Sequence, residues 1–120
     1  MAKIVGIEHV QLAMPTGGED AARGFYTGLL GLPERAKPPQ LAARGGCWFE
    51  APGVKVHLGV DGDFRAARKA HPALLVDDLA ALVKVLLGSN VAVIDDEPAE
   101  HRAQCYVSDP FGNRIELMQA

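Results

Sequence analysis

The chain repeats one order of predicted elements, a strand, a helix and further strands, with a period near sixty residues. His9 stands at the start of the first unit, and His71 stands at the start of the second, 62 positions later. His57 and Glu116 fall late in the closing strands of the two units, 59 positions apart. Few residues recur apart from Leu-Leu-Gly at the two helix ends, but the order of elements predicts two similar small units in one chain.

The first unit shows strand and helix periodicity in turn. Its predicted elements are a strand over residues 3–14, a helix that ends near Gly31, an irregular stretch rich in Pro and Gly, and two strands at Cys47–Glu50 and Val54–Val60. Thr16 and Glu19 have the spacing of a capping box at the start of that helix. In the last strand, Lys55 and His57 share the face opposite the valines and Leu58.

A polar run over residues 61–70 predicts the connector to the second unit. The predicted elements there are a strand over residues 71–77, a helix from Leu79 to Gly88, strands at Val91–Ile94, Gln104–Ser108 and Asn113–Gln119, and a hairpin turn at Asp109–Gly112. We therefore expect one domain over residues 1–120, with module one at about 1–60, the connector at 61–70 and module two at about 71–120.

Composition excludes several classes of protein. The 120 residues are 48% hydrophobic and 22% charged, which is enough apolar surface for a folded chain. The net charge is −3 and the basic residues are scattered, so we expect no nucleic-acid partner. The longest unbroken apolar run has five residues, far fewer than the ~20 that span a bilayer, so we expect a cytosolic protein without membrane contact. Cys47 and Cys105 are far apart and are expected to be reduced and buried.

Four polar residues on predicted strands form a candidate metal site: His9, His57, His71 and Glu116. Each has an apolar neighbour in sequence, and alternation turns the polar side chains to the face opposite the apolar set. A carboxylate between Ile115 and Leu117 is costly to bury without a partner. Imidazole and carboxylate together suit Zn, Fe, Ni, Mn or Co, although no local motif such as HExxH is present.

Other residues near these positions have alternative explanations. Trp48, Phe49 and Tyr106 could line a pocket, but aromatic residues on strands usually fill cores. His101 and Arg102 could bind an anionic group, but their acidic neighbourhood favours a solvated turn. Alternation predicts that Glu8 points away from His9, which leaves Glu8 outside the site.

Several segments resemble the vicinal oxygen chelate superfamily, which includes glyoxalase I, fosfomycin-modifying enzymes, extradiol dioxygenases and bleomycin-resistance proteins. The resemblance covers essentially the whole chain. Its most specific parts are the Phe-Tyr to Leu-Leu-Gly stretch of the first helix and the hairpin Asp-Pro-Phe-Gly-Asn-Arg-Ile-Glu-Leu at 109–117. The segments Ile-Glu-His-Val at 7–10 and Lys-Val-His-Leu at 55–58 add to it.

The resemblance implies an α+β fold of two βαβββ modules that form curved mixed sheets around a concave site. It also implies a homodimer whose subunits share each metal site. The glyoxalase I pattern places metal ligands at His9, His57, His71 and Glu116, whereas the fosfomycin-enzyme pattern uses only His9, His71 and Glu116. Glyoxalase I has a carboxylate or glutamine at the position of His57, so histidine there is a departure from its pattern.

The function implied is that of a divalent-metal-dependent lyase, isomerase or dioxygenase acting on a small oxygen-rich molecule. In this expectation the metal binds neighbouring oxygens of the substrate and acts as a Lewis acid. The alternative is a metal-free protein of the bleomycin-resistance type that sequesters a ligand. The retained set of ligand-type residues favours the enzyme.

Overall fold

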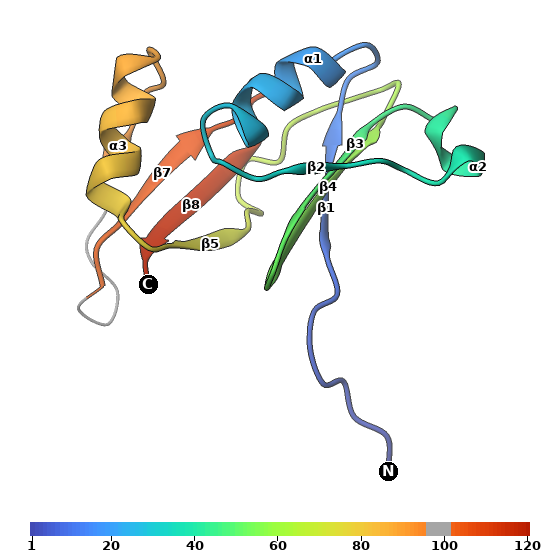
Figure 1. The fold of residues 1–120 in the computed structure, drawn as a ribbon, viewed down its shortest axis with the longest axis horizontal. Coiled ribbons are helices and arrows are strands. Elements are labelled where there is room, and N and C mark those ends of the chain that lie inside the picture. Colours follow the sequence, from blue (N-terminus) through green and yellow to red (C-terminus); the bar gives the residue numbers. More distant parts are fainter. Residues whose placement is uncertain (96–101) are drawn as a thin grey trace.

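The computed structural model describes residues 1–95 and 102–120, which form two four-stranded mixed sheets (Figure 1). The first sheet has the order β1-β4-β3-β2, with β1 at Val10–Met14, β2 at Glu34–Arg35, β3 at Cys47–Ala51 and β4 at Val54–Val60. The second sheet has the order β5-β8-β7-β6, with β5 at Ala73–Val76, β6 at Ile94–Asp95, β7 at Gln104–Ser108 and β8 at Arg114–Gln119. The predicted α+β class with two similar modules is confirmed.

Both sheets use the same pairing. In each, the first strand pairs in parallel with the last strand of its unit, and the other neighbours are antiparallel. This arrangement places β1 and β5 at the outer edges of their sheets. The predicted alternation in β4 is confirmed, because Val56 and Leu58 are almost fully buried in the core while His57 lies on the opposite face.

The helices, apart from the one at Pro39–Ala42, contribute buried side chains to the core. They are α1 at Glu19–Ala22, continued by a π-helical segment η1 at Arg23–Thr27, the short α2 at Pro39–Ala42, and α3 at Leu79–Gly88. The predicted capping box at Thr16 is wrong: the N-cap is Gly18, and the Glu19 carboxylate instead accepts a hydrogen bond from the backbone N–H of Gly46. η1 ends at Thr27 with Gly28 as its C-cap, and Gly31, which was expected to end the helix, has φ +75° at the close of the turn that follows.

A buried polar network joins the two modules. The Tyr26 hydroxyl of η1 donates to the Asp109 carboxylate at 2.7 Å, and the Asn113 side-chain amide donates to the backbone carbonyl of Ala13 at 2.8 Å. The Asp109 carboxylate also accepts from two backbone N–H groups of its own turn, those of Phe111 and Asn113. The hairpin between β7 and β8 is therefore fixed both to the helix and to β1.

The predicted first strand is too long. The structure pairs only Val10–Met14 with β4, and residues 3–9 have no partner strand in the described part of the chain. In the register that pairs Val10 with Val56, the first residue of β4, Val54, stands opposite Glu8, so residues 3–7 have no strand beside them. Glu8 and His9 lie beside the start of β4 but are not paired with it. Figure 1 shows this N-terminal segment running away from both sheets.

Smaller boundary errors occur in the second module. The strand expected over 71–77 is Ala73–Val76, the strand expected at Val91–Ile94 is Ile94–Asp95, and the last strand begins at Arg114.

Cys47 and Cys105 are free and buried as predicted, and burial raises the pKa of the Cys47 thiol to about 11. No helix in the described ranges is long and apolar enough to cross a membrane.

Candidate functional site

His57 lies at the centre of an aromatic stack on the polar face of the first sheet. Its ring lies between those of His9 and Trp48, with centroid distances of 4.3 and 4.5 Å and interplanar angles of 18° and 10°. Strand register places Trp48 directly opposite His57, while His9 comes from the segment just before β1. We call His9, His57 and Trp48 the histidine stack. Trp48 therefore packs against a polar side chain and does not fill the apolar core.

The Glu50 carboxylate fixes the His57 ring in the stack. His57 Nε2 lies 2.7 Å from Glu50 Oε2, and Arg35 donates to the other carboxylate oxygen at 2.9 Å. The His57 hydrogen bond, with Arg35 beside it, holds the pKa of Glu50 below its ordinary value. Since an ionised carboxylate only accepts hydrogen bonds, His57 Nε2 carries a proton, and in the neutral ring Nδ1 then has the lone pair.

The stack also limits how a metal ion could be held. Imidazole nitrogens direct their lone pairs in the plane of the ring, and the His9 and His57 rings lie nearly parallel at 4.3 Å. Their lone pairs therefore cannot meet at one ion unless one ring turns. In this arrangement His57 is hydrogen-bonded to Glu50, so His9 is better placed than His57 to bind a metal ion.

His71 and Glu116 form the second cluster, which we call the histidine–glutamate pair. His71 Nε2 lies 3.0 Å from Glu116 Oε1, and Nδ1 lies 2.8 Å from the backbone carbonyl of Lys69. A carbonyl only accepts, so Nδ1 carries a proton and Nε2 of a neutral ring is left with its lone pair toward Glu116. Two acceptors in contact require a cation, either a proton or a metal ion. A backbone carbonyl on the far nitrogen is the usual partner of a metal-binding histidine.

The four predicted site residues are thus brought together in two pairs and not in one cluster. His9 and His57 lie on the first sheet, and His71 and Glu116 lie on the second. Within residues 1–95 and 102–120 of a single chain, no three His, Cys, Asp or Glu side chains are grouped so that they could hold a metal ion. The donor types of the two pairs fit a divalent metal, but one chain does not place them around one point.

Two carboxylates near the histidine stack were misjudged or missed from the sequence. Glu8 does not point away from the site: its carboxylate lies 3.8 Å from His9 Nδ1 and accepts hydrogen bonds from Lys55. The alternation rule failed because Glu8 precedes the strand. Alternation places Glu50 on the same strand face as Trp48, but its contact with His57 depends on the register between β3 and β4, which the sequence does not give. Arg102 is exposed, and His101 lies outside the described residues.

Comparisons with known proteins agree with this arrangement of sheets. The family model of the Glyoxalase/Bleomycin resistance protein/Dioxygenase superfamily matches residues 6–117. A crystal structure assigned to the glyoxalase family, from Bacillus anthracis, is 44% identical, with a TM-score of 0.94 over 99% of this chain and 98% of that one. A comparison with curated proteins finds no match.

More distant solved structures share the fold. The fosfomycin resistance protein FosX of Listeria monocytogenes has 13% identity and a TM-score of 0.77, over 98% of this chain and 95% of its own. TnmS3, an antibiotic binding protein from Streptomyces, has 26% identity and a TM-score of 0.69, over 97% and 98%. On the extent of the family match and the 44% identity, the chain belongs to the glyoxalase/bleomycin resistance protein/dioxygenase superfamily.

Proposed function

We propose that this protein is a divalent-metal-dependent enzyme that acts on a small oxygen-rich molecule through two neighbouring oxygens. The observation that carries the proposal is the histidine–glutamate pair, in which His71 Nε2 lies 3.0 Å from a carboxylate oxygen of Glu116. Neighbouring ligand atoms of one ion stand about 3 Å apart, because bonds to imidazole nitrogen and carboxylate oxygen are about 2.0–2.2 Å long. The pair therefore has the spacing and the donor types of two ligands to the same ion.

His9, His71 and Glu116 are the ligands that we propose, and they would come from two chains. One chain holds His9 on the first sheet and the histidine–glutamate pair on the second, so a second copy must supply the missing part of each site. Two imidazoles and one carboxylate suit Fe, Mn, Co, Ni or Zn and leave positions open for substrate. When bound, the ion would act as a Lewis acid on the substrate oxygens.

His57 would act beside the metal and not on it. Trp48 and His9 hold the His57 ring from both sides, and Glu50 keeps the proton on Nε2. The lone pair on Nδ1 is then free to accept a hydrogen bond from a substrate hydroxyl or a water. This role is compatible with a lyase, an isomerase or a dioxygenase of the superfamily.

Unpaired strand edges support the homodimer. β1 and β5 are outer strands, and the apolar side chains of Ile4, Val5, Ile7 and Leu75 are 63–98% exposed. Exposed edges of this kind readily pair with another chain. We expect sedimentation equilibrium at micromolar concentration to give twice the 12.8 kDa chain mass. A monomer would remove the basis for a shared site.

Metal content tests the proposed function. Protein purified without chelator should hold about one divalent ion per chain, and the ion should raise Tm by about 10 °C, because it binds only the folded state. The measurement is elemental analysis together with thermal melts before and after dialysis against a chelator. A metal content far below one equivalent, with identical melts, would contradict the proposal.

A metal-free binding protein is the second candidate. A cavity of about 720 Å³ with one apolar end favours it, since such a cavity could hold a ligand without turnover. The similarity to TnmS3, an antibiotic binding protein, is in keeping with this candidate. For either candidate we propose the cytoplasm as the location, where the two free thiols would stay reduced.

A further inference from the structure

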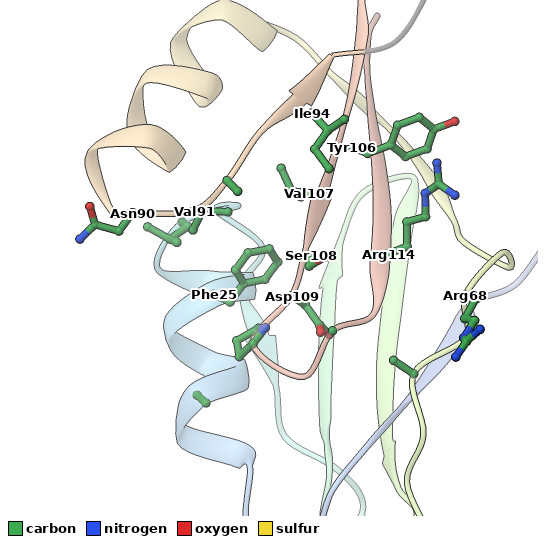
Figure 2. A pocket seen from close by; sticks show the side chains of 17 residues that line it. Phe25, Arg68, Asn90, Val91, Ile94, Tyr106, Val107, Ser108, Asp109 and Arg114 are labelled. Carbon is green, nitrogen blue, oxygen red and sulfur yellow. The ribbon is translucent and has the colours of Figure 1, made fainter.

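The cavity of about 720 Å³ lies at the free edge of β7. β6 pairs with β7 only as far as Tyr106, so the rest of this edge has no neighbouring strand in the described part of the chain. Figure 2 shows Phe25 and Val91 at one end of the cavity and Tyr106, Arg114 and Arg68 at the other, with Val107 between them. The volume is within the range of cavities that bind small molecules.

One end of the cavity is apolar. Phe25 comes from η1, Leu29 from the turn after it, Val91 from the segment after α3, and Val107 from β7. Phe25 and Val107 are buried in the core, so this wall is held in place by packing. Such a wall would take up the hydrocarbon or aromatic part of a ligand and remove it from water.

The other end is cationic. The Arg114 guanidinium lies 4.0 Å above the Tyr106 ring, which fixes its position at the cavity, and Arg68 adds a second, exposed charge. Neither arginine has an ion pair with a carboxylate among the described residues. Asp109 also lines the cavity, but its carboxylate is already bonded to Tyr26 and to Asn113.

The cationic end adjoins the histidine–glutamate pair. The His71 ring contacts the Tyr106 ring edge-on at 5.3 Å, and Tyr106 stands directly opposite Glu116 across β7 and β8. The Tyr106 ring thus touches both Arg114 and His71. A molecule held by Arg114 would have its polar end next to the proposed ligands.

We propose that this cavity binds a small molecule with an apolar body and one oxyanion, a carboxylate or a phosphate, which Arg114 neutralises. Binding in the cavity stands on the geometry alone, whereas its use as the substrate seat rests on the proposed metal-dependent function. An oxyanion paired with arginine is bound by charge-assisted hydrogen bonds. A neutral molecule of the same shape would lack them.

The test compares two probes that differ only in charge, 4-phenylbutyrate and 4-phenylbutanamide, by amide chemical-shift titration of the full chain. We expect the acid to bind at least about tenfold more tightly than the amide, with shifts centred on Val91, Tyr106 and Val107. Arg114→Gln should abolish this preference. The matched control Arg65→Gln, an exposed arginine outside the cavity, should keep it. Ala21→Trp places a large ring on the cavity wall from an exposed helix position. This variant should lower the affinity for both probes.

Equal affinity for acid and amide, an unchanged preference in Arg114→Gln, or shifts centred outside the cavity would each overturn the proposal. The titrations are run in chelator and repeated with added divalent metal. A chain that binds the acid but no metal keeps the cavity proposal and refutes the metal-dependent function. A chain that binds metal but binds the acid and the amide equally well refutes the cavity proposal and keeps the metal-dependent function.

Discussion

Replacing Asp109 with alanine should lower the free energy of unfolding by about 3–5 kcal/mol. The carboxylate is buried and accepts four hydrogen bonds, from the Tyr26 hydroxyl, the Asn113 side chain and the backbone N–H groups of Phe111 and Asn113. Without it, buried donors lose their acceptor, and the contact that ties the hairpin to the helix is broken. Urea denaturation of the metal-free protein measures the change.

Two further variants separate the parts of this effect. Tyr26→Phe removes only the hydroxyl and should cost about 1–2 kcal/mol, because Asn113 still satisfies the carboxylate. Asp63→Ala removes a carboxylate that is 90% exposed and should leave the unfolding free energy within about 0.5 kcal/mol of the original. An Asp109→Ala protein as stable as Asp63→Ala would show that the buried network does not hold the modules together.

Strand positions could be predicted where apolar and polar residues alternate and where Pro or Gly marks the end of the strand. β4 was predicted to the residue, because Pro52-Gly53 precedes it and Val54–Val60 alternates throughout. Residues 3–9 are also suited to a strand, but a strand needs a partner, and β4 reaches no further upstream than the position opposite Glu8. Likewise, Thr16 has the right spacing for a cap, but the turn at Gly17, with φ +81°, delays the helix to Glu19.

Candidate ligands could be found from the sequence, but their grouping could not. Periodicity placed His57 and Glu116 on polar strand faces, as the structure has them. Which faces meet depends on how the two sheets pack, and a single chain leaves the histidine stack and the histidine–glutamate pair separate. The bond from His57 to Glu50 was missed because it depends on cross-strand register, which no local pattern reveals.

Alanine variants of the proposed ligands should lose metal while the His57 variant keeps it. We expect His9→Ala, His71→Ala and Glu116→Ala each to weaken metal binding by more than about 100-fold, since each removes a direct ligand. His57→Ala should hold about one ion per chain, because the His57 ring is bonded to Glu50 and lies parallel to His9. Elemental analysis of the four proteins, purified side by side, measures this.

Each pattern of loss has a definite meaning. Loss in all four variants would show that His57 is a fourth ligand, as in the glyoxalase I pattern. Retention in both His9→Ala and Glu116→Ala would contradict the ligand set altogether. Circular dichroism of each variant shows whether a loss of metal comes from a loss of fold.

The shared site is tested most directly by a heterodimer of two defective chains. His9→Ala and Glu116→Ala chains carrying different tags are produced together, and the mixed dimer is purified through both tags. If each site takes His9 from one chain and the histidine–glutamate pair from the other, the mixed dimer has one complete site and one doubly damaged site. We predict about one metal ion per mixed dimer and almost none in either parent. A mixed dimer as empty as its parents would contradict a site shared between two chains.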